Sequence, residues 1–385
     1  MKIKVGYSNN KDAYEAGKEI AKKVTEEINP KAGILFNSVK YDQDKILEGI
    51  KEISQNFDVI GSTSSAGIMT QDGYMIDEDG VAGMITFDDE NLLIACYGLE
   101  KETDARTTGR NVALKALEKA SIDYAPDYFF MTSSPKDEEE YIKGIQDVIG
   151  RVPCFGGSAA DNTIEEKWKI FYNENIFTEG VAVAFFYTEK EITTEFTGAY
   201  TETDNVGIIT KVKDNRILEE INNKKAIDVY KEWCKLKEKD DLRDDILTES
   251  IINPLGIKDR LGNLIAIRHP METLEDGSIK LGSNIAEKTA VIKMEASIDD
   301  LVTSASITLK NLKKKSPKPA GYLLVHNACR RLALGERMEE IYESLKKETK
   351  GLPFLMPFTF GEYGYADDQT NTTGDLMLSF TSFEE

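Results

Sequence analysis

The sequence predicts a mixed α/β fold in which β-α-β-α-β-β units recur, with mixed sheets covered by helices. Three observations support this fold class. Apolar stretches rich in β-branched and aromatic residues alternate with stretches whose apolar residues follow helical spacing. Two similar glycine-led strands, at residues 80–87 and 180–187, each end one run of this alternation. Matching glycines also recur at constant separations, which is typical of an internal repeat.

The first unit is expected within residues 1–90. A strand at 2–7 is followed by a helix that carries small and apolar residues along one face of 13–28. A second strand at 32–36 leads to a helix that Asp42 can cap. A buried strand that runs into a loop of small residues follows, before the glycine-led strand closes the unit.

A second unit is expected within residues 92–190. Its first helix presents small and apolar residues along one face of 109–120, and a strand follows at 128–131. Ser134 can cap the next helix, with Pro135 at the first helical position. The acidic run that follows is typical of a helix N-terminus with a solvated face.

The separation of matching residues supports a duplication. Gly98 follows Gly6 at the same distance as Gly109 follows Gly17. The two units would be pseudo-repeats that together form an N-terminal domain over residues 1–195.

Residues 196–385 are expected to form a C-terminal α+β domain that contains a possible third related unit. The pattern predicts a hairpin at 207–219, a helix along 298–312 and a strand at 322–327. The stretch from Pro357 to Gly364 then takes the place of the small-residue loop.

The composition excludes several classes of function. A net charge of −20 argues against a nucleic-acid partner, because phosphate binding needs clustered lysine and arginine. No apolar run is long enough to cross a bilayer, so we expect no membrane insertion. The four cysteines are far apart and form no CxxC pair, which is typical of reduced thiols in a cytoplasmic protein. With only two histidines in the sequence, we expect neither a metal site nor a cofactor.

A small-residue loop is the first candidate for function. Between Gly61 and Gly67 lie three serines and a threonine, and each hydroxyl can both donate and accept a hydrogen bond. Such a loop can cradle a small polar ligand, or it can be a tight turn made of turn-forming residues.

Four motifs in order along the chain resemble those of the FIST family. Residues 61–67 resemble the cysteine-containing motif of the FIST N-terminal domain, with Ser62 at the frequent cysteine. Residues 156–161 are similar to a second motif of that domain. Residues 327–335 and 360–362 are similar to two motifs of the FIST C-terminal domain, where Asn327 stands at the place of a frequent cysteine.

The resemblance implies a sensory protein of signal transduction that binds a small polar metabolite, an amino acid among the candidates, at the junction of its two domains. A separate signalling protein is then a possible partner, because no output segment is recognised in the sequence. Arg330 or Arg331 could clamp a carboxylate, and Glu362 in its aromatic surroundings could hold an ammonium group. Alternatively, the arginines pair with surface acids such as Glu336 or Glu339, or Arg330 pairs with Glu362. The candidate ligand-binding residues are Gly61, Ser62, Thr63, Ser64, Ser65, Gly156, Gly157, Ser158, Asn327, Arg330, Arg331, Gly361 and Glu362.

Two other classes of function stay open. A hydrolase or transferase could use Ser62, Ser64 or Cys329 as nucleophile, with His326 as the histidine on a plausible strand end. The loop lacks the first glycine of a GxSxG motif, which weighs against this alternative. A purely structural interaction module is the third possibility.

Overall fold

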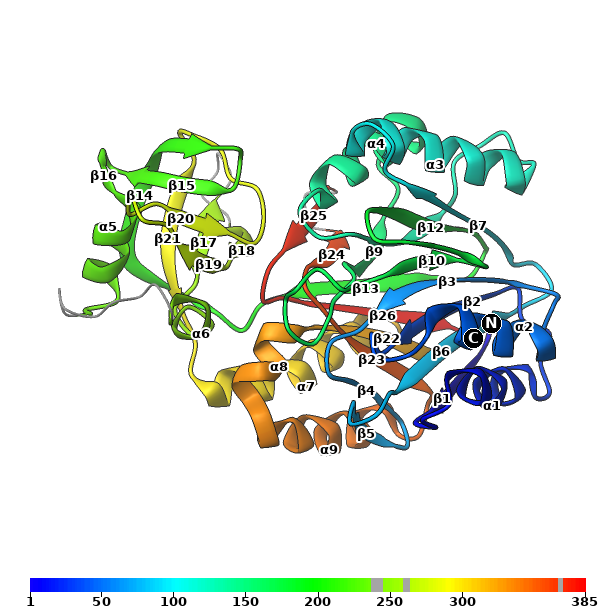
Figure 1. Cartoon of the computed structure of the whole chain (residues 1–385). Coiled ribbons are helices and arrows are strands. Elements are labelled where there is room, and N and C mark those ends of the chain that lie inside the picture. Colours follow the sequence, from blue (N-terminus) through cyan, green and yellow to red (C-terminus); the bar gives the residue numbers. More distant parts are fainter. Residues whose placement is uncertain (237–244, 259–263, 366–369) are drawn as a thin grey trace.

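The computed structural model describes residues 1–236, 245–258, 264–365 and 370–385 (Figure 1). Three six-stranded sheets form one body, and a fourth sheet belongs to a smaller domain at its side. The predicted mixed α/β architecture is thus confirmed. The two chain ends lie together on the body, where the amino group of Met1 donates to the carbonyl oxygen of Glu384 at 2.7 Å.

The first unit is built from residues 2–88 and has its helices on the outer face of its sheet (Figure 1). The predicted cap is confirmed, because the side chain of Asp42 accepts a hydrogen bond from the amide of Lys45 at 3.1 Å. The elements of the unit are β1 (Lys2–Ser8), α1 (Ala13–Thr25), β2 (Ala32–Asn37), α2 (Gln43–Ile53), β3 (Asp58–Thr63), β4 (Gly67–Thr70), β5 (Gly73–Ile76) and β6 (Ala82–Asp88).

The second unit follows the same order over residues 93–187. The predicted start of its second helix was wrong: the helix begins at Glu138, whereas Ser134 instead accepts a hydrogen bond from the amide of Gly180 at 3.1 Å. The elements are β7 (Leu93–Glu100), α3 (Ala105–Ala120), β8 (Tyr128–Ser133), α4 (Glu138–Ile149), β9 (Cys154–Gly157), β10 (Ile170–Tyr172), β11 (Asn175–Phe177) and β12 (Gly180–Tyr187).

The third unit consists of residues 192–197 and 298–384. Its helix α7 starts with a capping box in which Ser297 and Asp300 bond reciprocally. The elements are β13 (Ile192–Thr197), α7 (Ile298–Lys315), β22 (Pro319–Asn327), α8 (Ala328–Leu334), the 3₁₀ turn η1 (Gly335–Arg337), α9 (Met338–Thr349), β23 (Phe354–Thr359), β24 (Glu362–Tyr365), β25 (Asn371–Gly374) and β26 (Leu378–Glu384).

The three sheets share one strand order, and each receives a hairpin from another unit. Hairpin β10–β11 of the second unit extends the sheet of the first beside β3, hairpin β4–β5 extends the sheet of the third beside β23, and hairpin β24–β25 extends the sheet of the second beside β9. The three units therefore interlock in a ring. Strands from both sides of residue 195 share sheets, so the body is not divided at that residue. The division of the sequence into domains 1–195 and 196–385 stays a prediction.

Amide side chains fasten the exchanged hairpins. Asn173 Oδ1 accepts a hydrogen bond from the amide of Val59, and Asn371 Oδ1 accepts one from the amide of Cys154, both at 2.9 Å and both near the start of the neighbouring strand. The core between the sheets is aromatic: the ring centroid of Phe155 lies 5.8 Å from that of Phe130 in the same unit and 5.8 Å from that of Phe383 in the third unit.

Residues 201–295 form a separate insert domain, because the chain leaves the third unit after β13 and returns to it at α7 (Figure 1). The predicted hairpin at 207–219 is present as β14 and β15. The domain has its own core, to which Tyr230 and Trp233 contribute. Its elements are β14 (Thr201–Lys213), β15 (Ile217–Ile221), β16 (Lys224–Lys225), α5 (Ala226–Trp233), α6 (Ile246–Glu249), β17 (Leu255–Lys258), β18 (Leu264–Arg268), β19 (Pro270–Thr273), β20 (Ile279–Leu281) and β21 (Ala290–Glu295).

Candidate functional site

The three strand-end loops meet where the three units join. The amide of Ala160 donates to the carbonyl oxygen of Thr63, and the amide of Ser158 donates to that of Gly361, both at 2.9 Å. The amide of Ser65 completes the ring by donating to the carbonyl oxygen of Phe358 at 2.9 Å. The loops that carry the sequence motifs therefore contact one another directly.

The hydroxyl groups of these loops are buried and bond to other protein groups. Ser62 Oγ accepts from Thr132 at 2.8 Å, and Ser64 Oγ donates to the carbonyl oxygen of Gly67 at 2.9 Å. Ser158 Oγ donates to Oε1 of Glu138 at 3.1 Å. These bonds hold the loops in place and use the polar groups that were expected to face a ligand.

Two glycines of the motifs are required by close backbone packing. A Cβ atom on Gly61 would lie 1.8 Å from the carbonyl oxygen of Leu35, and one on Gly156 would lie 2.0 Å from that of Met131. Both neighbours belong to the adjacent parallel strand, so any side chain here would force the strands apart. Gly157 and Gly361 lie against each other, since a Cβ on Gly157 would be 2.8 Å from the carbonyl oxygen of Gly361.

Glu362 lies in a buried group of polar residues that we call the central cluster: Asn327, Thr359, Glu362 and the amide of Met377. Asn327 Nδ2 donates to both carboxylate oxygens at 3.1 and 3.2 Å, and Thr359 and Met377 donate at 3.0 Å. Burial raises the pKa of Glu362 well above its usual value, although these donors act in the opposite direction. Asn327 Oδ1 also caps α8 by accepting from the amides of Cys329 and Arg330.

The two arginines have structural partners. The buried guanidinium of Arg330 donates to the carbonyl oxygens of Leu301 at 3.2 Å and Leu376 at 3.3 Å, and to the hydroxyl of Ser304. Its Nε has no hydrogen-bond partner among the residues that the structure describes. Arg331 Nε donates to the hydroxyl of Tyr74 at 2.8 Å. Within the described residues, neither arginine forms the ion pair with Glu336, Glu339 or Glu362 that the sequence left open.

The residues of the hydrolase alternative are not arranged for nucleophilic activation. His326 Nδ1 bonds to the carbonyl oxygen of Asn327 at 2.9 Å, and burial lowers the pKa of this histidine to about 3. Burial raises the pKa of Cys329 to about 12, so its thiol stays protonated at neutral pH. The described hydrogen bonds of Ser62 and Ser64 do not include His326.

A second buried polar group, not expected from the sequence, joins the body to the insert domain. We call it the junction cluster: Glu138, Glu139, Arg216, Arg268 and Asp375. Arg216 Nη2 donates to Glu138 at 2.7 Å and to Glu139 at 2.9 Å. Burial raises the pKa of Glu138, whereas for Glu139 the nearby Arg216 and Arg268 outweigh the effect of burial and lower its pKa. The expected solvated face of the acidic run was therefore wrong for these two residues, because α4 packs against the insert domain.

The other half of the junction cluster joins the insert domain to the segment after β25. The amide of His269 donates to Asp375 Oδ2 at 2.9 Å, and the hydroxyl of Ser283 donates to Oδ1. Arg268 Nη1 donates to the carbonyl oxygen of Thr373 at 3.1 Å. Burial raises the pKa of Asp375 and lowers that of Arg268.

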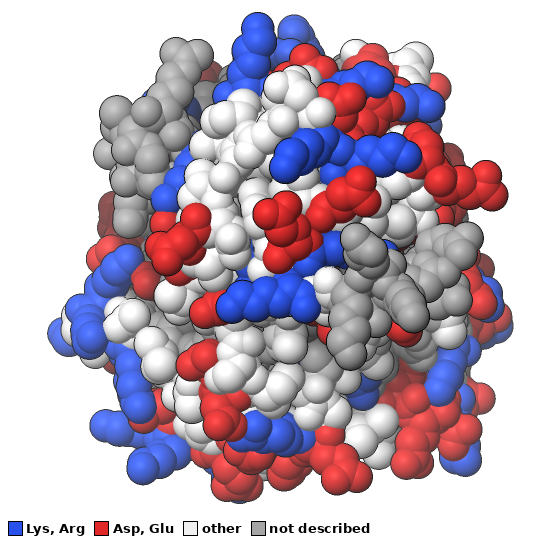
Figure 2. Space-filling model, turned by 90° about the vertical axis from the view of Figure 1, so that its left-hand side faces the viewer, with Lys and Arg blue, Asp and Glu red and all other residues white. Residues whose placement is uncertain are grey.

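A cleft of about 1060 Å³ opens beside the junction cluster, between α4 and the insert domain. Asn284 links the cleft to the junction cluster. It lines the cleft, its backbone amide donates to Glu139 at 2.8 Å and its Oδ1 accepts from Arg216 at 2.9 Å. The charged residues of the cleft have both signs: Glu140, Lys143, Lys258, Glu287 and Lys288. The insert-domain side of the molecule likewise shows both signs interspersed (Figure 2).

Fold and cleft together define an α/β protein of interlocked units with a ligand-sized cleft at a domain junction. The chain belongs to the FIST family: the model of the FIST N domain matches residues 31–224, and that of the FIST C domain matches residues 226–365. The expected family is thus confirmed. FIST domains are sensory domains of signal transduction.

Two solved structures from Thermotoga maritima align over 99% of this chain. PurLQS has 8% identity, 72% of its chain covered and a TM-score of 0.23. Phosphoribosylformylglycinamidine synthase II has 9% identity, 71% coverage and a TM-score of 0.22. A search of curated proteins returned no match. Among the described helices, none is long and apolar enough to cross a membrane.

Proposed function

We propose that this protein is a sensory module that binds a small polar metabolite carrying both charges, such as an amino acid, in the cleft between α4 and the insert domain. The observation that carries the proposal is the position of the cleft. Its walls come from two bodies that meet over ion pairs, with Glu140 and Lys143 on one side and Glu287 and Lys288 on the other. Ligand sites are common at such domain interfaces.

The mixed charges of the walls suit a zwitterion. An ammonium group can be held by glutamate and a carboxylate by lysine, while Asn284 can donate to or accept from the ligand. Of the residues expected from the sequence, Ser158 bonds to Glu138 of the junction cluster beside the cleft, and Glu138 in turn pairs with Arg216. We therefore assign Ser158 a supporting role.

Binding in this position would give the protein a response to its ligand. A molecule that contacts both walls stabilises the arrangement in which α4 and the insert domain are close, and it shifts the population toward that arrangement in proportion to its differential affinity. A separate signalling protein could then recognise the position of the insert domain.

A thermal-unfolding screen of the full chain with individual amino acids and small polar metabolites tests the proposal. A ligand present at a hundredfold excess over its Kd stabilises the folded state by about 2.7 kcal/mol. We expect one ligand class to raise the Tm, and the increase to be lost in Lys143→Ala and Lys288→Asn. Asparagine suits position 288 because the φ of Lys288 is 65°.

The matched control is Lys22→Ala, which removes a lysine from the exposed side of α1. This variant should keep the full ligand-induced increase in Tm. The proposal is wrong if the increase survives both cleft substitutions, or if no compound of the panel raises the Tm.

A further inference from the structure

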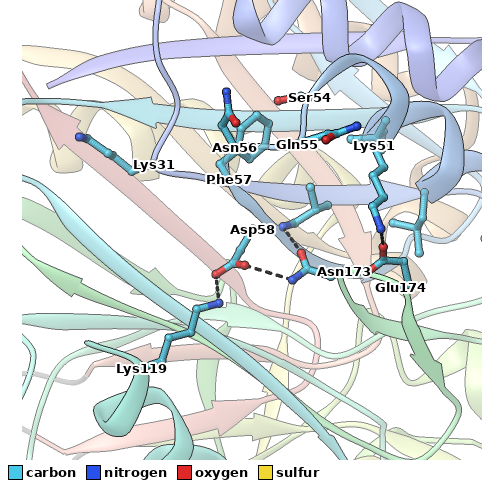
Figure 3. A pocket seen from close by; sticks show the side chains of 13 residues that line it. Lys31, Lys51, Ser54, Gln55, Asn56, Phe57, Asp58, Lys119, Asn173 and Glu174 are labelled. Atoms are coloured by element: carbon cyan, nitrogen blue, oxygen red, sulfur yellow. Dashed lines mark hydrogen bonds and ion pairs between the residues drawn. The ribbon is translucent and has the colours of Figure 1, made fainter. Parts of the chain in front are cut away.

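A second pocket lies at the seam between the first and second units (Figure 3). Its volume is about 410 Å³, which is within the usual range for small-molecule sites. It lies at the start of β3, whereas the loops of the central junction follow the end of this strand. The pocket is therefore separate from both polar clusters and from the cleft at the insert domain.

One side of the pocket is apolar. Leu47, Ile50 and Val59 line it and are each at least 94% buried. Phe57 adds an aromatic ring beside Asn56, as Figure 3 shows. Such a surface favours a ligand with a planar apolar body, which loses unfavourable contact with water on binding.

The opposite side is a row of polar residues that comes from both units (Figure 3). Lys119 at the end of α3 pairs with Asp58 and donates to the hydroxyl of Tyr172 at 2.7 Å. Asp58 Oδ1 also accepts from Asn173 Nδ2 at 3.1 Å. At the far end of the row, Lys51 of α2 forms an ion pair with a glutamate of the β10–β11 turn. These bonds hold the row in place.

The charge of the pocket favours an anion. Its lining has three lysines against the two carboxylates of Asp58 and Glu174, a positive excess on a protein whose net charge is −20. Lys51 and Lys119 are paired within the row. In the described part of the chain, the ammonium group of Lys31 forms no ion pair. Lys31, which also lines a neighbouring hollow beside β1, is therefore the lysine of the lining that has no carboxylate partner among the described residues.

The corresponding places in the other two sheets show that this charge is not required by the fold. Asp58 pairs with Ala32 at the start of two parallel strands. In the second unit the matching residue is Pro153, which immediately precedes β9. In the third unit it is Phe354 of β23, which pairs with Tyr322. Both of the other units place an uncharged residue there, so the carboxylate of Asp58 is specific to the seam beside the first unit, whereas the asparagine of the row recurs as Asn371 beside β9.

We infer that this pocket binds a small aromatic anion, with the ring against Ile50 and Phe57 and the anionic group on Lys31. Because its walls come from two units, a bound ligand would also link the first unit to the hairpin and α3 of the second. This inference does not depend on the ligand proposed for the cleft at the insert domain.

The test is a fluorescence titration of the full chain with 2-naphthoate, an aromatic carboxylate, and with its uncharged analogue 2-naphthamide. We expect saturable binding of 2-naphthoate, and binding of 2-naphthamide that is weaker by about tenfold or more, the value of one charge-assisted hydrogen bond. Lys31→Met should weaken 2-naphthoate binding by a similar factor and leave 2-naphthamide binding unchanged.

Control variants separate the pocket from nonspecific effects. Lys22→Met on α1 should leave both affinities unchanged, and Phe57→Ala should weaken both compounds together, because the ring contact does not depend on ligand charge. The unfolding transition of each variant shows whether it is folded. The inference is overturned if 2-naphthoate does not bind saturably, if it binds no better than the amide, or if folded Lys31→Met binds it as well as the parent chain.

Discussion

The central cluster and the junction cluster both bury carboxylates, but they stabilise them differently. Glu362 receives its hydrogen bonds from neutral donors of its own unit. Glu138 and Glu139 instead share a guanidinium, Arg216, that belongs to a different domain. The hydrogen bonds to Glu362 can form as soon as the third unit folds, because all of their donors belong to that unit. An ion pair across a boundary forms only when the insert domain docks.

The central cluster is therefore a fixed part of the body, whereas the junction cluster can open when the insert domain moves away from the body. Removing a donor from the central cluster leaves the carboxylate of Glu362 buried without one of its hydrogen bonds, and water cannot replace the lost bond. Opening the junction cluster exposes its charges to water, which compensates them in part. We therefore expect substitutions in the central cluster to lower the stability of the whole body, and substitutions in the junction cluster to release the insert domain.

The largest effect is expected for Asn327→Leu. The change removes the amide that donates to both carboxylate oxygens of Glu362, and it removes the cap of α8. Together these losses should lower the free energy of unfolding by about 3–4 kcal/mol. Urea unfolding followed by circular dichroism measures the loss. Combining this change with Glu362→Met should recover part of it, since the carboxylate without donors is then gone. A double variant less stable than the single one would contradict the assignment.

The next effect concerns the junction. Arg216→Met leaves Glu138 and Glu139 without their shared cation, and we expect the docked arrangement of the insert domain to weaken by about 2–3 kcal/mol, less than for a fully enclosed pair because the side chain of Arg216 is 14% exposed. Hydrogen exchange should become faster along β14–β21 and at the start of α4, and it should stay slow in β2 and β22. Uniformly faster exchange in all three sheets would show that the cluster supports the body as a whole.

The contrast also explains what the sequence could and could not predict. Helical and strand periodicities identify the units, and hydroxyls between Gly61 and Gly67 mark a loop at a strand end. The exchange of hairpins is not encoded locally, because the residues of β10 alternate in the same way whichever sheet they join. The burial of the loops likewise depends on all three meeting at one point, so residues suited to a ligand became residues that hold the units together.

The junction cluster was missed for a related reason. Acidic residues at a helix start usually face water, and Arg216, in the turn between two strands, lies 78 positions away from Glu138. A useful signal would have been the density of the acidic run itself: three successive glutamates open α4, more than the helix dipole requires.

Lowering the pH should destabilise both the body and the insert domain, because each contains a buried histidine. Burial lowers the pKa of His326 to about 3 and that of His269 to about 4, from a usual 6.5. Between these values the unfolded chain binds more protons than the folded one, so stability falls as the pH decreases below 6.5. Each histidine contributes up to about 1.4 kcal/mol per pH unit, or roughly 2 kcal/mol between pH 6.5 and 5.

Single substitutions assign this pH dependence to the two regions. His326→Asn should flatten the pH dependence of the free energy of unfolding of the body. His269→Asn should flatten only the pH dependence of exchange in the insert domain. Buried Glu362 and Asp375, whose pKa values are raised, act in the opposite direction above their usual pKa, so the comparison must be made against the parent chain at each pH.

The smallest effect provides the most closely matched comparison. Thr359 Oγ1 donates to Glu362 at 3.0 Å in the central cluster, and Thr373 Oγ1 donates to Glu139 at 3.1 Å in the junction cluster. Valine has nearly the same shape as threonine, so each substitution removes one hydrogen bond to a buried carboxylate, about 1–2 kcal/mol. Thr359→Val should lower the Tm of the body, whereas Thr373→Val should leave it unchanged and speed exchange in the insert domain. Equal losses of Tm in both variants would mean that the insert domain unfolds together with the body, and the division between fixed and movable clusters would then be wrong.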